Sequence, residues 1–258
     1  MDSIQEQIQK KLAEIEEREH IRIIYACESG SRAWGFASPD SDYDVRFVYV
    51  RPLEDYLKLE EGRDVIEAEL NDVYDINGWD LPKLLKLLTK SNPVIFEWAD
   101  SPIVYKTTEE WSRVWSILPE YFVPFKGMYH YVSMAKRNIR ENFQVPDVNR
   151  KKYFYVLRPI LAYDWIQQKK CPPPAAFSKL VAEVLPEELR SSVDTLLEEK
   201  MKAGEKERGP HIPVLEAYIA KKLSEASAYL ESASEKTEAD WLTVDACFRE
   251  IVMSAVRN

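Results

Sequence analysis

The chain has 258 residues, 45% of them hydrophobic, which is enough for one large domain or two ordinary ones with a normal core. Its formal net charge of -9 at pH 7 argues against a surface coated all over by nucleic acid. No apolar run approaches the ~20 residues of a membrane helix, and the first residues are too polar for a signal peptide, so we expect a cytoplasmic protein without a membrane partner.

The first hundred residues mix helical and extended patterns. Apolar residues at helical spacing predict a helix over residues 3–19. Extended apolar runs predict strands over residues 21–26, 45–51, 64–70 and 72–77. Further helices are predicted over residues 81–90 and 94–99. Strands packed against helices over this stretch predict a mixed α/β domain.

After about residue 107 the strand signal fades. Helices are predicted over residues 128–143, 151–169, 176–185, 186–205, 212–232 and 239–256, separated by proline-rich or glycine-containing breaks. The predicted fold class is therefore α/β (α+β), with a mixed-sheet domain over residues 1–115 followed by an all-helical domain over residues 116–258.

The most informative motif joins the first two predicted strands. Gly30-Ser31 follows the first apolar run, and Asp42-Tyr43-Asp44 opens the next run, eleven residues after the serine. Because residues i and i+2 of a strand point to the same face, Asp42 and Asp44 are expected to project together. Two hard carboxylates side by side suit Mg²⁺, and a pair of such ions can activate a hydroxyl and stabilise a leaving oxygen.

The Gly-Ser pair suits the phosphate end of the same chemistry. Gly30 allows a tight turn or the close approach of another group to the backbone. Ser31 offers a hydroxyl and an amide N–H at the N-terminus of a predicted helix, where phosphate binds well. An isolated Asp-x-Asp is common in turns and at solvated strand ends, but the complete combination is much rarer. The motif therefore predicts a site for a metal ion and a nucleotide.

This combination resembles the active-site pattern of the DNA polymerase beta-like nucleotidyltransferase superfamily. Residues 28–36 (ESGSRAWGF) and 41–49 (SDYDVRFVY) resemble more closely a bacterial group, the RNA-repair-associated polymerase-beta family, and the likeness extends over most of the chain. The resemblance implies a Mg²⁺ cofactor at a two-ion site, with Mn²⁺ as a substitute, and an NTP as partner. It also implies that Asp42 and Asp44 hold the metals and that Gly30 and Ser31 hold the β- and γ-phosphates.

The superfamily pattern implies a third acidic residue on a later strand. Asp75 is flanked by Tyr74 and Ile76, so it reads as a strand residue facing away from its apolar neighbours. Asp80 stands just before a predicted helix with a proline in its first turn, where it reads as the N-cap. We favour Asp75 as the third catalytic and metal-binding carboxylate and keep Asp80 as the alternative.

Positive charge is concentrated in one window of this acidic chain. Residues 126–158 carry eight Lys and Arg against two acidic side chains, a net charge of +6. Lys136 and Arg140, four residues apart, form one cationic stripe on a predicted helix. A local basic face of this kind suits phosphate binding, although a charged and solvated helix surface gives the same pattern.

A second stripe follows on the next predicted helix. Lys152, Tyr155 and Arg158 are three residues apart and so lie near one face. By resemblance we assign Lys152 and Arg158 to the nucleotide phosphates, since Arg forms bidentate phosphate contacts and Lys acts as a point charge. In the rival interpretation Tyr155 belongs to the core and the two cations are solvated.

Together these features predict a nucleotidyltransferase that moves an NMP from an NTP, such as ATP, to a hydroxyl acceptor and releases pyrophosphate. An RNA 3′ end, in a role in RNA repair, is the first choice of acceptor, and a protein or small-molecule hydroxyl is the alternative. The rival from another class is a catalytically silent nucleotide-binding or scaffold module. The acceptor, the preferred NTP and the use of a template stay open at this stage.

Overall fold

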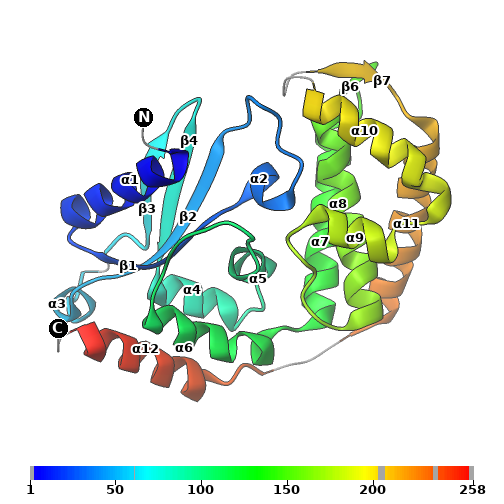
Figure 1. The fold of residues 1–258 in the computed structure, drawn as a ribbon. Coiled ribbons are helices and arrows are strands. Elements are labelled where there is room, and N and C mark those ends of the chain that lie inside the picture. The colour runs from blue at the N-terminus through cyan, green and yellow to red at the C-terminus, as the bar shows by residue number, and fades with distance from the viewer. Residues whose placement is uncertain (1–2, 61, 203–206, 235–237, 256–258) are drawn as a thin grey trace. The chain divides into compact units, whose positions relative to one another are not determined.

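The computed structural model describes residues 3–60, 62–202, 207–234 and 238–255, and these form two compact units (Figure 1). The first unit comprises the described parts of Met1–Ala33, Asp42–Tyr121 and Glu238–Asn258. The second comprises those of Trp34–Ser41 and Phe122–Thr237. Each unit is therefore built from segments that are separated in the sequence.

A five-stranded mixed sheet forms the centre of the first unit, in the order β3-β4-β2-β1-β5. Its strands are β1 (Arg22–Glu28), β2 (Tyr43–Val50), β3 (Val65–Leu70), β4 (Tyr74–Asp80) and β5 (Val104–Thr107). The pair β2–β4 is parallel, whereas β1–β2, β1–β5 and β3–β4 are antiparallel. The mixed sheet confirms the predicted α/β fold class, and four of its five strands were predicted near their observed positions.

Helix α1 (Ile4–Glu19) covers one face of this sheet. It begins at Ser3 in a capping box with Glu6, which satisfies amide groups of the first turn. Its buried residues Ile8, Leu12 and Ile15 lie in one hydrophobic cluster with Val45, Phe47 and Tyr49 of β2. Because side chains alternate along a strand, this packing leaves the even-numbered residues of β2 for the opposite face.

Helices cover that opposite face. They include α4 (Leu81–Leu88), α5 (Pro93–Ala99), α6 (Glu109–Ile117) and α12 (Trp241–Ala255), with the short helices α2 (Gly30–Trp34) and α3 (Leu53–Tyr56) in the connections. Trp98 of α5 contacts Trp79 of β4 in a tilted arrangement, with 4.2 Å between ring centroids, and Trp111 of α6 stacks on Tyr25 of β1 at 4.0 Å. The sequence analysis predicted neither α6 nor β5.

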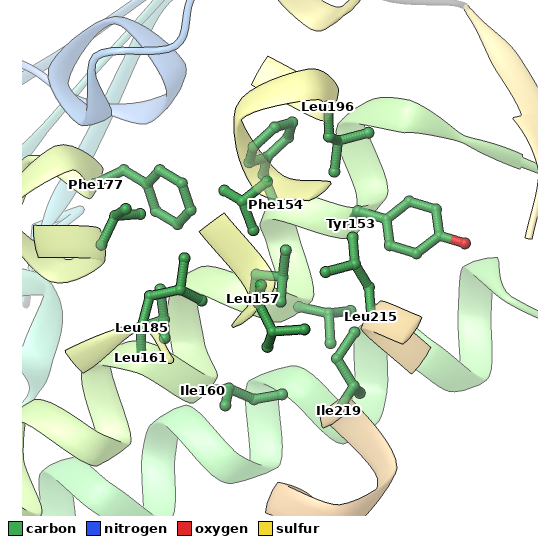
Figure 2. Close-up of a cluster of buried hydrophobic side chains, with 14 of the residues drawn as sticks. Tyr153, Phe154, Leu157, Ile160, Leu161, Phe177, Leu185, Leu196, Leu215 and Ile219 are labelled. Atoms are coloured by element: carbon green, nitrogen blue, oxygen red, sulfur yellow. The ribbon is translucent and has the colours of Figure 1, made fainter. Parts of the chain in front are cut away.

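The second unit is mainly helical. It contains α7 (Pro124–Asn142), α8 (Arg150–Lys169), α9 (Phe177–Val184), α10 (Arg190–Lys202) and α11 (Pro213–Ser232). Helix α8 is central, and its buried residues contact side chains from α9, α10 and α11 in one apolar cluster (Figure 2). A two-stranded ribbon of β6 (Asp147–Asn149) and β7 (Arg208–Pro210) was not predicted.

The units differ from the expected division at residues 115 and 116. That boundary falls inside α6, which belongs to the first unit together with the 3-10 turn Leu118–Tyr121. Helix α12 also belongs to the first unit, where it packs against α4 and α6, although it lies at the far end of the chain. Sequence order alone does not reveal such a return of the chain. Among the described residues, no helix combines the length and apolarity that crossing a membrane requires.

Candidate active site

Strand pairing in the first unit brings distant carboxylates together. Asp44, the second residue of β2, is the parallel register partner of Asp75 on β4. Glu28, the last residue of β1, pairs with Val45 beside them. Asp42 lies just before β2, and its main-chain carbonyl accepts a hydrogen bond from Arg32 Nε at 3.0 Å. Glu28, Asp44 and Asp75 thus come together from three separate strands.

Arg46 connects two of these carboxylates. Its Nη2 donates to Asp44 Oδ1 at 3.0 Å and to Asp75 Oδ2 at 2.6 Å. Its Nη1 donates to the main-chain carbonyl of Asp75 at 2.7 Å, so the guanidinium fork fixes both the side chain and the backbone of that residue. Without a cation between them, two neighbouring carboxylates repel each other. The sequence analysis missed Arg46, although its position two residues after Asp44 on the same strand face was the available signal.

Gly30 packs directly against Asp44. Its backbone is left-handed, with φ +60°, and a Cβ at this position would lie 1.9 Å from Asp44 Oδ2. The neighbouring amide of Ser29 donates to the carbonyl of Asp44 at 2.8 Å, which holds the two backbones close. The structure therefore explains the glycine of the Gly-Ser pair by steric fit to the carboxylate, because any side chain here would displace it.

Glu28 holds the main chain of Asp44 in place. This glutamate is fully buried, and its Oε1 accepts from the Asp44 amide at 2.7 Å while Oε2 accepts from the Tyr105 hydroxyl. Burial raises the pKa of Glu28 to about 7, although both hydrogen bonds lower it in part. The sequence analysis did not identify Glu28 as a site residue. Its signal was a carboxylate at the end of an otherwise apolar strand.

Ser31 and Arg32 lie on the short helix α2. Ser31 is buried, with 3% of its surface exposed. The Arg32 guanidinium carbon lies 3.8 Å from the centre of the Tyr43 ring, a cation–π distance, so this arginine is held between Tyr43 and the carbonyl of Asp42. The connection after β1 and the start of β2 are thereby fixed to each other.

Asp80 lies elsewhere on β4. Its register partner on β2 is Tyr49, five residues beyond the Asp44–Asp75 pair, which is about 16 Å along a strand. The Asp80 carboxylate accepts from the Tyr56 hydroxyl at 2.6 Å and lies 3.6 Å from Arg51 Nε. Burial raises its pKa to about 6, although these two partners lower it in part. Asp80 occupies the N-cap position of α4, as expected, but its side chain makes no capping hydrogen bond.

The other two predicted nucleotide-binding residues lie on α8 of the second unit. Lys152 Nζ is 5.2 Å from the centre of the Tyr155 ring. Arg158 is buried, with 2% of its surface exposed, and its guanidinium carbon is 4.5 Å from the centre of the Trp34 ring. Trp34 and Tyr155 also contact each other edge to face, so one aromatic pair carries both cations.

The donor set of the first unit fits Mg²⁺. Asp42 and Asp44 would supply the hard carboxylate oxygens that this ion prefers. Within the part of the chain that the structure describes, no three His, Cys, Asp or Glu side chains are grouped as an all-protein metal site. Mg²⁺ commonly takes only one or two carboxylates and completes its shell with water and substrate phosphates, so two aspartates beside a nucleotide are sufficient.

Comparison with known proteins gives two further findings. A sequence profile described as "RNA repair pathway DNA polymerase beta family" matches residues 4–250. A protein of Bacillus subtilis (strain 168), described as "Uncharacterized protein YcgL", is 44% identical over 236 residues, which cover 90% of this chain and 89% of that protein. The first match agrees with the resemblance carried by the Gly-Ser and Asp-Tyr-Asp motifs.

Proposed function

The chain belongs to the RNA repair pathway DNA polymerase beta family, and from this we propose that it is a Mg²⁺-dependent nucleotidyltransferase. In the proposed reaction an acceptor hydroxyl attacks the α-phosphorus of an NTP. The bond from this phosphorus to the bridging oxygen breaks, pyrophosphate leaves, and the hydroxyl proton passes to Asp75. The nucleoside monophosphate ends on the acceptor oxygen.

The observation that carries the proposal is the Asp44–Arg46–Asp75 arrangement beside Gly30. Asp42 and Asp44 would hold Mg²⁺, which lowers the charge on the phosphates and activates the attacking oxygen when it is bound. Arg46 holds Asp75 close to the proposed metal site, because it donates hydrogen bonds to the side chain and to the main-chain carbonyl of Asp75. Gly30 leaves Asp44 Oδ2 uncrowded and lets phosphate oxygens approach the backbone.

The protein's contribution is mainly positioning. Phosphoryl transfer depends on alignment and charge stabilisation more than on covalent chemistry by side chains. The buried hydrogen bonds of Glu28 to the Asp44 amide and to Tyr105 support such alignment, since they fix the strand that carries Asp44. Lys152 and Arg158, which lie against aromatic rings, are also proposed to contact nucleotide phosphates.

We propose an RNA end as the acceptor. The family description refers to an RNA repair pathway, and the +6 window of the second unit suits a phosphate backbone. Transfer to a protein or small-molecule hydroxyl is the alternative within enzymes. A catalytically silent nucleotide-binding or scaffold module is the rival from another class, and the presence of both Asp42 and Asp44 argues against it.

Pyrophosphate release tests the proposal. Purified protein is incubated with each α-labelled NTP, Mg²⁺ or Mn²⁺, and separate pools of RNA, protein and metabolites. We expect label on RNA and an equal amount of pyrophosphate. Asp42→Asn and Asp44→Asn should each abolish turnover, whereas Asp72→Asn, an exposed aspartate in the β3–β4 turn, should retain it.

Other results would change the assigned residues, the acceptor class or the proposed activity. Full turnover of the Asp42→Asn/Asp44→Asn double variant would refute the assignment of these residues. Label on protein or on a metabolite would replace RNA as the acceptor class. Binding of Mg²⁺ and NTP without pyrophosphate release in any pool would support the silent module.

A further inference from the structure

The outward face of α7 carries an uninterrupted cationic stripe. At 100° per residue, Lys126, Tyr129, Ser133, Lys136, Arg137 and Arg140 fall within an arc of roughly 100°. The residues buried on this helix, which include Met128, Tyr131 and Ala135, fall on the opposite side. We call these six outward residues the α7 stripe. Helix α7 is thus amphipathic, with one side in the core of the second unit and the other in solvent.

The charges of the stripe are available for a ligand. Lys136, Arg137 and Arg140 are exposed, and none of the three pairs with another residue that the structure describes. By contrast, many cations of the second unit have a carboxylate partner, as Lys169 has in Glu183 and Lys222 in Asp164. On a chain with a net charge of -9, these three cations, beside which Glu141 is the acidic residue of α7, form a local positive surface.

An aromatic side chain stands in the same stripe. Tyr129 is 60% exposed, so its ring is open to a ligand. Cations that follow a backbone, combined with an exposed ring on which a base can stack, are the elements of a single-strand nucleic-acid site. The stripe from Lys126 to Arg140 is about 21 Å long, which matches about six stacked nucleotides.

We propose that the α7 stripe binds single-stranded RNA, with Lys136, Arg137 and Arg140 on the phosphates and Tyr129 under a base. This inference rests on the proposed transfer to RNA, for which it supplies the surface that holds the acceptor strand. It concerns the strand rather than the NTP, so it is separate from the roles proposed for Lys152 and Arg158.

RNA binding, measured in the absence of nucleotide transfer, tests the inference. A labelled 12-nucleotide RNA is titrated with the full chain in the absence of NTP, and fluorescence anisotropy is followed from 50 mM to 1 M salt. Three lost phosphate contacts should reduce the slope of log affinity against log salt by about 2 and weaken binding at 50 mM salt on the order of 100-fold in the variant K136Q/R137Q/R140Q. Tyr129→Ala should weaken it roughly fivefold or more with an unchanged slope.

A charge-matched control separates a site from general attraction. The variant K10Q/K90Q/R113Q removes three exposed cations of the first unit, from α1, from the turn after α4 and from α6, and should bind RNA as the wild type does. Equal losses in both triple variants, or no loss in the α7 triple variant, would overturn the inference. Equal competition by polyglutamate of the same charge would also overturn it and would indicate an acidic protein partner.

The outcomes also separate this inference from the proposed function. Salt-sensitive binding that depends on the α7 stripe, in a protein that transfers no nucleotide to RNA, would support the surface and refute the acceptor. Transfer to RNA that is unaffected in the α7 triple variant would leave the enzyme assignment intact and refute the surface. Circular dichroism of both triple variants should match the wild type, since all six positions are exposed.

Discussion

Replacing Gly30 with alanine should disable the candidate active site while the protein stays folded. The new Cβ would lie 1.9 Å from Asp44 Oδ2 and 2.8 Å from its Cγ, distances that real contacts do not reach. The carboxylate must therefore move, and its 3.0 Å hydrogen bond to Arg46 is then lost. A displacement of about 1 Å in a reacting group costs on the order of 100-fold in rate.

The backbone part of the stability cost of the same change is modest. Gly30 has φ +60°, where an L-residue costs about 1–2 kcal/mol. In a protein of this size that corresponds to a loss of roughly 2–8 °C in Tm. Gly35 provides a matched control, because its φ is +88° and a Cβ there would meet no atom within 4 Å. Gly35→Ala thus introduces the strain of a positive φ, but its new Cβ collides with no neighbouring atom.

Two measurements distinguish the variants. Pyrophosphate release should fall at least 100-fold in Gly30→Ala and little in Gly35→Ala. The rise in Tm on addition of Mg²⁺ and NTP should survive in Gly35→Ala and be reduced in Gly30→Ala, because binding to the native state stabilises it. If Gly30→Ala kept both the turnover and the ligand-dependent Tm of Gly35→Ala, the reasoning from the Asp44 contact would be wrong.

Two further predictions concern the neighbouring charges. Arg46→Lys should lower turnover on the order of 10-fold or more, because one ammonium cannot hold both Asp44 and Asp75 as the fork does; wild-type turnover in this variant would remove Arg46 from the site. Asp80→Asn should retain turnover that Asp75→Asn loses. Since the pKa of Asp80 is raised to about 6, the wild type should lose about 2 kcal/mol of unfolding free energy through this group as pH rises from 4 to 6, and urea unfolding of Asp80→Asn should lack that loss.

Local patterns were sufficient for most of the fold. The apolar spacing of residues 3–19 predicts α1, and extended apolar runs predict four strands of the sheet. The strand β5 was missed because it has only four residues, two of which are exposed. Helix α12 was predicted as a helix, but no local signal shows that it returns to the first unit, since that depends on packing against α4 and α6.

Residues of the candidate site that belong to a sequence motif could be predicted from the sequence. Contacts that depend on strand pairing could not. Gly30 and the Asp-Tyr-Asp motif are continuous in sequence, and the structure supplies a steric reason for the glycine. Glu28, Arg46 and Tyr105 were missed because their roles come from hydrogen bonds across three strands. Glu28 and Arg46 nevertheless lie inside the motif segments 28–36 and 41–49, whereas Tyr105 has no such signal in its own segment.

The choice between the two candidates for the third carboxylate follows from the same pairing. The register Asp44↔Asp75 continues one residue at a time to Tyr49↔Asp80, so all positions of β4 are fixed by one pair. Asp75 and Asp80 are five residues apart. A regular strand thus places Asp80 about 16 Å from Asp75, and the Asp80 carboxylate contacts Tyr56 and Arg51 instead. Because Arg46 contacts Asp75 directly, the register favours Asp75 as the partner of Asp44 in the proposed reaction.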